Sequence, residues 1–385
     1  MSFFVEVETA SLIKTGEELC GDSVTILRAP ESFIAVLSDG LGSGVKANIL
    51  STLTGKIAST MLEKGSTLEE VVETLIQTLP VCKVRGLAYA TFTVVQIFND
   101  GRLYIVESDN PELLFFREGQ FQRLNREKRL IANKAIYESS TRLTEGDTLV
   151  LLSDGVVNAG IGGMRPLGWP LKEIALEIVK LIKMRGDRVT AKDIASHIRD
   201  RSQEFYRSQI GDDTTVLALR VRKPRELIVA VGPPQDKTRD QEYVKTFAAT
   251  PGKKVVCGGT TSTLVARELG RQLKVNFDGS KEIPPTGSIE GVDLVTEGIV
   301  TICKALSLMQ EANGNTHFIT GLDGASQLSL ILLQADRVHF LVGQAINPAH
   351  QNPNLPRHLA LKNQVVKELG SYLETLGKEI EISFY

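Results

Sequence analysis

Cysteine and histidine are scarce in this sequence, and neither occurs at a metal-binding spacing. The four cysteines lie far apart and form no C-x-x-C pair, which argues against a disulfide framework and against a thiolate zinc site. The five histidines do not cluster with them. We therefore expect reduced thiols, as in a cytosolic protein, and no zinc or copper centre.

The sequence also lacks an excess of charge of one sign and a long apolar run. It contains 44 lysine and arginine residues against 46 aspartate and glutamate residues, a formal net charge of -2. This balance predicts no nucleic acid and no membrane as partner. No segment approaches the roughly 18 uncharged residues of a membrane span, and the first residues do not resemble a signal peptide. We expect a soluble, cytoplasmic protein.

A length of 385 residues suggests two domains. The charged segment 220–226 contains a proline and separates two differently built regions, which predicts one domain over 1–222 and a second over 227–385. In the second region, strand, glycine turn and helix alternate, as in an α/β domain with a parallel sheet. Strands are expected there near 328–333, 338–342 and 379–384.

The first region mixes strands with a few helices. After Gly44, five apolar residues recur every four positions and predict one long amphipathic helix. They are Val45, Ile49, Leu53, Ile57 and Met61.

Acidic residues follow or precede apolar strands at four points of the first region. Each has a glycine or a second acid beside it, and two repeat the sequence Ser-Asp-Gly. Any one of them alone is most simply a turn, because Asp and Gly are favoured turn residues. Together they predict carboxylates that converge at one edge of a sandwich: Asp22, Asp39, Asp154 and the pair Asp212-Asp213.

Converging carboxylates repel each other unless a cation lies between them. All five histidines lie outside these motifs, and a site with only oxygen ligands suits Mg²⁺ or Mn²⁺. Two such ions about 3.5–4 Å apart would activate a water and hold the oxygens of a phosphate. The pattern therefore favours hydrolysis of a phosphoester.

The order of these motifs resembles the metal-dependent serine/threonine phosphatases of type 2C (the PPM family), and most of all their bacterial sporulation and stress-regulator branch. The motifs are 21–22, 38–44, 153–155 and 211–216. The resemblance covers residues 1–222. It implies an α+β fold, a four-layer α-β-β-α sandwich of two antiparallel sheets with a two-ion Mn²⁺ or Mg²⁺ site between them, and a phosphorylated protein as substrate.

The resemblance also implies roles for individual residues. Asp39 would bridge both ions, the Gly40 carbonyl would bind one of them, and Asp154 and Asp212 would bind the other. Asp22 would complete the site directly or through a water, and Asp213 is the less expected ligand of its pair.

The phosphate-binding group is less clear from the sequence. Ser43 stands where many relatives have a histidine, and a serine hydroxyl is too weak an acid to replace it. The candidate phosphate-binding residues are Lys14, Arg28 and Ser43, although Lys14 and Arg28 each also fit an exposed strand residue.

No family is recognised for residues 227–385. The run Gly258, Gly259, Thr260, Thr261 between a strand and a helix could hold a small anion on its backbone N–H groups, helped by Lys253 or Lys254, or could simply cap the helix. A polar loop at 347–353 is a second candidate ligand site.

The sequence leaves three functions open. The first is a protein phosphatase with an appended regulatory or recognition domain. The second is a ligand-sensing protein that keeps an inactive phosphatase-like scaffold, and the third is a structural interaction protein with neither activity.

Overall fold

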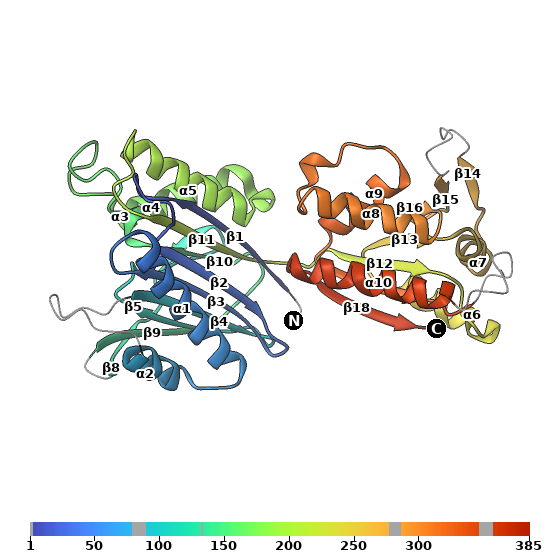
Figure 1. Ribbon diagram of the computed structural model, residues 1–385, viewed down its shortest axis with the longest axis horizontal. Helices are drawn as coiled ribbons and strands as arrows, with labels where there is room; N and C mark the ends of the chain where they lie inside the picture. The colour runs from blue at the N-terminus through green and yellow to red at the C-terminus, as the bar shows by residue number, and fades with distance from the viewer. Residues whose placement is uncertain (1–2, 79–89, 132–133, 277–285, 346–356) are drawn as a thin grey trace. The chain divides into compact units, whose positions relative to one another are not determined.

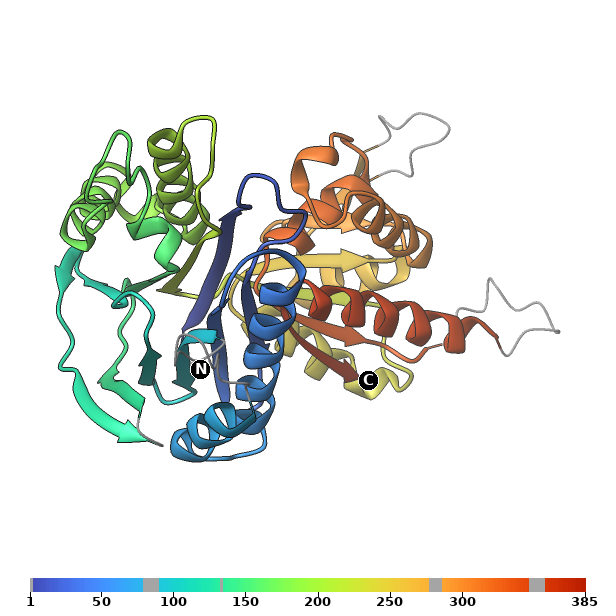
Figure 2. The same cartoon turned by 60° about the vertical axis from the view of Figure 1, so that its left-hand side comes forward.

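The computed structural model describes residues 3–78, 90–131, 134–276, 286–345 and 357–385, so the polar loop at 347–353 lies outside the described residues. The chain divides into two compact units, Met1–Lys223 (unit 1) and Pro224–Tyr385 (unit 2). Each unit has its own sheets and helices (Figures 1 and 2).

Unit 1 contains two antiparallel sheets. Five strands form the first, in the order β1 (Phe4–Leu12), β11 (Thr214–Arg222), β10 (Thr148–Leu152), β6 (Leu114–Arg117), β7 (Gln120–Gln122). Six strands form the second, in the order β2 (Asp22–Arg28), β3 (Ser32–Gly40), β4 (Ala90–Phe98), β5 (Arg102–Ser108), β9 (Lys134–Arg142), β8 (Glu127–Ile131).

Helices cover the outer face of each sheet. Apolar side chains of α1 (Gly44–Glu63) and α2 (Leu68–Thr78) share a core with the six-stranded sheet. The other sheet shares a core with α3 (Asp154–Val157), α4 (Leu171–Arg185) and α5 (Ala191–Tyr206), while the short η1 (Gly186–Arg188) precedes α5. A third core, which includes Phe33, Leu37 and Leu217, lies between the sheets. The predicted α-β-β-α sandwich is confirmed.

The face that α1 buries differs from the expected one. Val45, Ile49 and Leu53 are 56%, 58% and 43% exposed, and the buried face carries small side chains: Gly44, Ala47, Ser51, Thr54, Gly55, Ala58 and Ser59, with Leu62. A Cβ on Gly55 would lie 2.4 Å from the Thr25 hydroxyl oxygen of β2. The first half of the helix thus lies too close to the sheet for large side chains, and Val45, Ile49 and Leu53 point outward. Ile57 and Met61, further along, are half-buried and pack against the core as predicted.

Unit 2 has one sheet of seven described strands. Their order is β14 (Lys274–Asn276), β15 (Thr286–Ser288), β16 (Leu294–Thr296), β13 (Lys253–Cys257), β12 (Glu226–Val231), β17 (Arg337–Val342), β18 (Glu379–Phe384). The pairs from β16 to β18 are parallel, and β14 and β15 pair antiparallel. This mostly parallel sheet confirms the predicted α/β class.

Alternate residues of β12 face opposite sides of this sheet, as the period of a strand requires. Leu227 and Val229 share a core with α8 (Ile299–Glu311), α9 (Gly324–Gln334) and α10 (Arg357–Thr375). Ile228 and Ala230 share a second core with α6 (Asp240–Ala249) and α7 (Gly259–Leu269). The short helices η2 (Lys237–Arg239) and η3 (Thr316–Phe318) lie in connections. Helices therefore cover both faces of the sheet.

The prediction of a strand at 328–333 in unit 2 is wrong. Residues 328–333 belong to α9, because the Asp323 side chain accepts hydrogen bonds from the backbone N–H groups of Ala325 and Ser326 at 3.0 and 3.1 Å and so caps a helix. A short apolar run does not by its period distinguish a buried helix from a strand.

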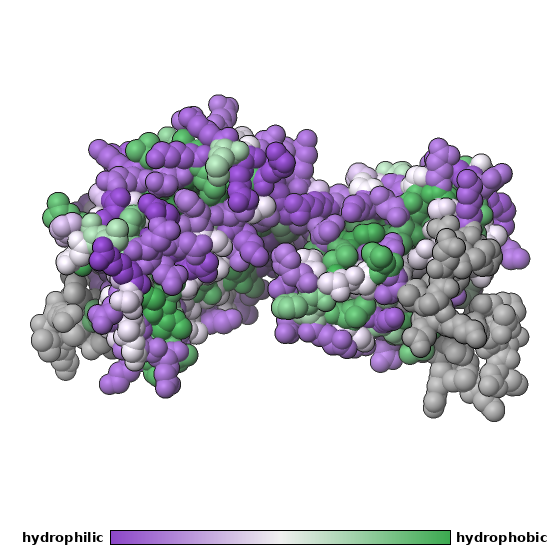
Figure 3. All heavy atoms as spheres, turned by 90° about the horizontal axis from the view of Figure 1, so that it is seen from above, coloured by the Kyte–Doolittle hydropathy of each residue, from purple (hydrophilic) through white to green (hydrophobic). Residues whose placement is uncertain are grey.

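Hydrophilic residues dominate the surface of unit 1 in the view of Figure 3, whereas unit 2 shows more hydrophobic surface there. Among the helices in the described part of the chain, none combines the length and the apolar character that crossing a membrane requires.

Candidate metal centre

Four strand ends bring the predicted acids to one place. Asp22 begins β2 and lies directly opposite Asp39 near the end of β3. Asp154 follows β10 as the first residue of α3, and Asp212 and Asp213 directly precede β11, the neighbour of β10. The site therefore draws on the ends of both sheets.

The pKa values of these carboxyl groups show how close they lie. Burial, followed by the charges of Asp22, Asp154, Asp212 and Asp213, raises the pKa of Asp39 from 3.8 to about 9. Burial, with the neighbouring acids, also raises the pKa of Asp154 and of Asp212. The Asp39 carboxyl group therefore keeps its proton at neutral pH unless positive charge is added nearby.

Asp22 has the least compensated carboxylate. It is 5% exposed, and neither carboxylate oxygen has a hydrogen-bond partner. Burial raises its pKa to about 7, which the nearby hydroxyls of Ser153 and Thr215 only partly oppose. A buried carboxylate of this kind needs a cation or a proton.

This donor set fits hard divalent cations, because it consists of oxygen atoms only and its charges repel each other. Within the described residues, however, no three His, Cys, Asp or Glu side chains are placed so that they could hold one ion together. Two observations therefore support divalent cations at this site: the donors are all oxygen atoms, and the buried Asp22 carboxylate has no hydrogen-bond partner. The side chains do not form a coordination geometry in advance.

Two glycines allow the backbone segments of the site to approach each other. A Cβ on Gly40 would lie 2.0 Å from the Ala47 carbonyl oxygen, and a Cβ on Gly155 would lie 2.0 Å from the Asp213 carbonyl oxygen. Any larger residue would force these segments apart. The glycine of each Ser-Asp-Gly sequence therefore has a packing role in addition to any role in binding.

Asp213 makes contacts that suit a structural anchor. Its Oδ2 accepts from the Gly21 N–H at 2.9 Å and its Oδ1 accepts from the Lys14 N–H at 3.0 Å. The carboxylate thus fixes the connection between β1 and β2 against the start of β11. The first acid of the pair, Asp212, has its oxygens more open to other ligands.

The structure brings only one of the two candidate cations to the site. The Lys14 Nζ lies 3.8 Å from Asp212 Oδ1. Arg28 is the last residue of the seven-residue strand β2, which begins at Asp22, and its guanidinium donates to the Val5 carbonyl at 2.7 Å and lies over the Phe4 ring. A strand of that length separates its ends by about 20 Å, so Arg28 does not reach the carboxylates.

Ser43 precedes α1, and its hydroxyl donates to Glu17 Oε1 at 2.6 Å. Glu17 was not expected from the sequence, because it stands in no motif. This contact joins the connection between β1 and β2 to the start of α1. Asn48 of α1 reinforces it by donating to the Cys20 carbonyl at 2.8 Å.

Tyr206 is a second residue that the sequence did not indicate. Its hydroxyl donates to the Gly155 carbonyl at 2.7 Å, and burial, with the nearby Asp212 and Asp154 charges, raises its pKa to about 12. It therefore stays protonated at neutral pH and holds the turn that carries Asp154.

In unit 2, Gly258 and Gly259 stand at the junction of β13 and α7, with Thr260 exposed and Thr261 buried. Lys253 and Lys254 lie at the opposite end of the five-residue strand and donate to Gln334 and Thr250. The prediction that these lysines help to bind the anion is wrong, because a strand of that length holds their backbone about 13 Å or more from Gly258. The anion site stays a prediction.

Comparison with known proteins identifies unit 1. The family model described as stage II sporulation protein E (SpoIIE) matches residues 29–222, slightly more than half of the chain. Stage II sporulation protein E of Bacillus subtilis (strain 168) is 23% identical over 228 residues, which cover 57% of this chain and 26% of that protein. The chain thus spans about a quarter of the length of this curated relative.

Solved structures show similarity to slightly more than half of the chain. The PP2C phosphatase domain with a regulatory-domain fragment of SpoIIE from Bacillus subtilis is 22% identical, with a TM-score of 0.48, over 57% of this chain and 64% of that one. RsbX in complex with magnesium is 18% identical, with a TM-score of 0.42, over 56% of this chain and 95% of that one. The resemblance expected from the acidic motifs is confirmed: this protein belongs to the stage II sporulation protein E family and carries its PP2C-type phosphatase domain in residues 29–222.

Proposed function

We propose that unit 1 is a metal-dependent phosphatase that removes phosphate from phosphoserine or phosphothreonine of a partner protein. The observation that carries this proposal is the convergence of five carboxylates at a buried place, where burial and then the neighbouring charges raise the pKa of Asp39 to about 9. Such a cluster is costly in the metal-free protein, and the cost is removed when divalent cations bind.

Asp39, Asp154 and Asp212 would hold two Mn²⁺ or Mg²⁺ ions, with the Gly40 carbonyl and Asp22 completing the site. Two bound ions would supply an activated water and neutralise charge on the phosphate oxygens. Asp213 holds the adjoining backbone through its two N–H contacts and is a positioning residue. RsbX, a protein of similar fold, has been solved in complex with magnesium.

Lys14 is the cation of this chain that we assign to the substrate phosphate. Its amine lies 3.8 Å from Asp212, at the border of the carboxylates. Ser43 is engaged by Glu17, so its hydroxyl is not directed to a leaving group. Protonation of the leaving serine oxygen therefore falls to water in the site and not to this side chain.

The test is phosphate release from a phosphoserine peptide and from p-nitrophenyl phosphate by the full chain. We expect turnover that requires Mn²⁺ or Mg²⁺, stops with EDTA and falls at least 100-fold in Asp39→Ala and in Asp154→Ala. Asp200→Asn changes an exposed acid of α5 and serves as the matched control. Activity that survives both alanine substitutions would overturn the proposal.

Unit 2 is assigned a regulatory or recognition role in this proposal. The alternative is that the whole chain senses a small anionic ligand through unit 2 and that unit 1 is an inactive scaffold. The exposed helix start at Gly259 and Thr260 is the feature that favours it. Calorimetry with inorganic phosphate distinguishes the two: binding to unit 2 together with no metal-dependent turnover would favour the alternative.

A further inference from the structure

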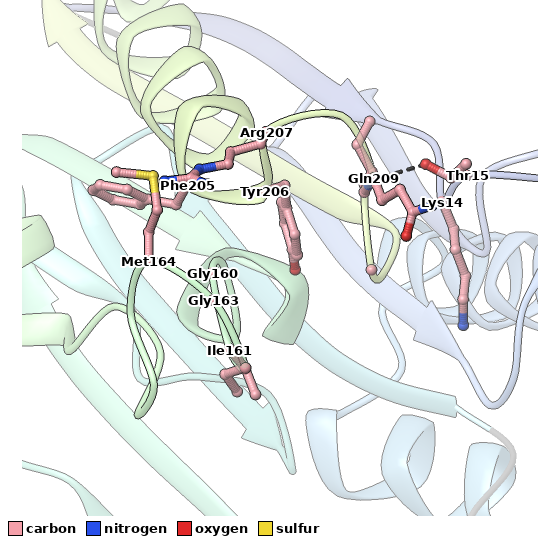
Figure 4. A pocket seen from close by; sticks show the side chains of 13 residues that line it. Lys14, Thr15, Gly160, Ile161, Gly163, Met164, Phe205, Tyr206, Arg207 and Gln209 are labelled. Carbon is pink, nitrogen blue, oxygen red and sulfur yellow. Dashed lines mark hydrogen bonds between the residues drawn. The ribbon is translucent and has the colours of Figure 1, made fainter.

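A pocket of about 560 Å³ lies in unit 1, and its lining contains no acidic residue. It is formed by the segment after β1, the glycine-rich loop 160–164, the end of α5 and the loop 209–211 (Figure 4). The charged residues that line it are Lys14 and Arg207. In Figure 4 their side chains lie on opposite sides of Tyr206.

Two contacts and one chain connection join this pocket, which we call the cationic pocket, to the carboxylate cluster. The Lys14 Nζ is 3.8 Å from Asp212 Oδ1. Gly211 lines the pocket and directly precedes Asp212 in the chain. The Tyr206 hydroxyl donates to the carbonyl of Gly155, the residue after Asp154. A phosphorylated residue held at the carboxylates would therefore have its neighbours at this pocket.

Arg207 is free to meet a ligand. It is exposed, and no acidic side chain among the described residues lies within ion-pair distance of its guanidinium. The neighbouring arginines differ: Arg165 pairs with Glu173, and Arg201 pairs with Glu204.

The backbone at Arg207 is also unusual. It follows α5 with a φ of 61°, a conformation that normally favours glycine at the end of a helix. A bulky charged side chain at such a position is conformationally costly, and residues of this kind are often found where function requires them.

We propose that this pocket binds an acidic side chain of the phosphoprotein, within about three residues of the phosphorylated residue, and that Arg207 selects it while Lys14 contacts the phosphate. The inference rests on the proposed phosphatase function. Three residues of extended chain span about 10 Å, so a side chain this near in sequence to the phosphorylated residue can enter a pocket whose lining includes Lys14, the neighbour of Asp212. The exposed apolar side chains of Ile161 and Met164 border the cations and provide contact for the aliphatic part of the peptide.

The test uses the full chain with Mn²⁺ and a set of phosphoserine peptides. The peptides differ only in carrying Glu, Gln or Lys at each of the three positions on either side of the phosphoserine. We expect kcat/KM to be about 5- to 10-fold higher with Glu than with Lys at one or more positions at low salt, and this ratio to shrink at 0.5 M NaCl because the charges are exposed.

Variants assign the preference to the pocket. In Arg207→Gln we expect the ratio of kcat/KM for the Glu peptide to kcat/KM for the Lys peptide to fall to half of the wild-type ratio or less. Arg207→Lys should retain most of the wild-type ratio. Arg188→Gln changes an exposed arginine of unit 1 that does not line the pocket, so its ratio should equal that of the wild type.

Equal kcat/KM for Glu and Lys peptides at every position would overturn the inference while the proposed function stands. A preference that Arg207→Gln leaves unchanged would overturn it as well. Absence of turnover with every peptide and with p-nitrophenyl phosphate would overturn the proposed function, and this inference falls with it.

Discussion

Replacing Asp39 by asparagine should stabilise the metal-free protein. In the folded chain the pKa of Asp39 is raised from 3.8 to about 9, first by burial and then by the neighbouring aspartates. Between pH 3.8 and about 9 the Asp39 carboxylate therefore holds its proton in the folded chain and has lost it in the unfolded chain. By linkage, the free energy of unfolding of the metal-free wild type falls as pH rises from about 4 to about 9.

The size of the effect follows from the same values. A tenfold change in proton affinity corresponds to about 1.4 kcal/mol, so a rise of the pKa from 3.8 to about 9 sets an upper limit of about 7 kcal/mol on the cost of Asp39. The asparagine amide is also buried and loses its hydration, which offsets part of the gain. We therefore expect the free energy of unfolding of Asp39→Asn to exceed that of the wild type by about 2–4 kcal/mol at pH 8. For a unit of this size that is roughly 5–15 °C in Tm.

The assay is thermal unfolding of the full chain in EDTA at pH 5, 6.5 and 8, comparing wild type, Asp39→Asn and the control Asp200→Asn. The gain from Asp39→Asn should be small at pH 5 and largest at pH 8, and the control should follow the wild type throughout. If Asp39→Asn unfolds at or below the wild-type temperature at pH 8, or if its gain does not grow with pH, the reasoning about the carboxylate cluster is refuted.

Three further predictions concern packing around the site. Gly155→Ala places a Cβ 2.0 Å from the Asp213 carbonyl oxygen and should lower both the Tm and the metal-dependent turnover; unchanged turnover would contradict this. In Gly163→Ala the Cβ has no neighbour closer than 3.6 Å, so the Tm of this control should equal that of the wild type. Asp213→Ala leaves two backbone N–H groups without their acceptor and should cost about 2–4 kcal/mol in urea unfolding, and a loss under 0.5 kcal/mol would count against the anchoring role. Ile49→Gln should change the free energy of unfolding by less than about 0.5 kcal/mol, and Leu62→Ala should reduce it by about 2–4 kcal/mol. A larger loss in Ile49→Gln than in Leu62→Ala would show that the face of α1 that carries Ile49 is buried in solution.

Much of unit 1 could be predicted from the sequence because its signals are local. Asp39 and Asp154 each stand at the end of an apolar run within a Ser-Asp-Gly sequence, and the order of the acidic motifs is sufficient to indicate the family. The sandwich followed from that resemblance. Which acids bind metal stays a prediction, because the described side chains are not arranged around an ion.

The residues that were missed act through long-range contacts. Glu17 accepts a hydrogen bond from the Ser43 hydroxyl across 26 residues of sequence, and the Tyr206 hydroxyl donates to the Gly155 carbonyl across 51. No short motif encodes such pairs.

The face of α1 was mispredicted for a related reason. The repeat of apolar residues such as Ile49 shows where they lie around the helix but not how close the helix comes to the sheet. The small residues at Ala47, Ser51, Gly55 and Ala58 determine that distance.

The central claim is that the carboxylate cluster binds two divalent cations, and the most direct test is the number of Mn²⁺ ions bound per full-length chain at pH 8, measured by titration calorimetry. The account predicts two ions for the wild type, a reduced number or an affinity at least 10-fold lower for Asp39→Asn, and wild-type binding for Asp200→Asn. No binding by the wild type at millimolar Mn²⁺, or binding that Asp39→Asn and Asp154→Asn leave unchanged, would contradict it.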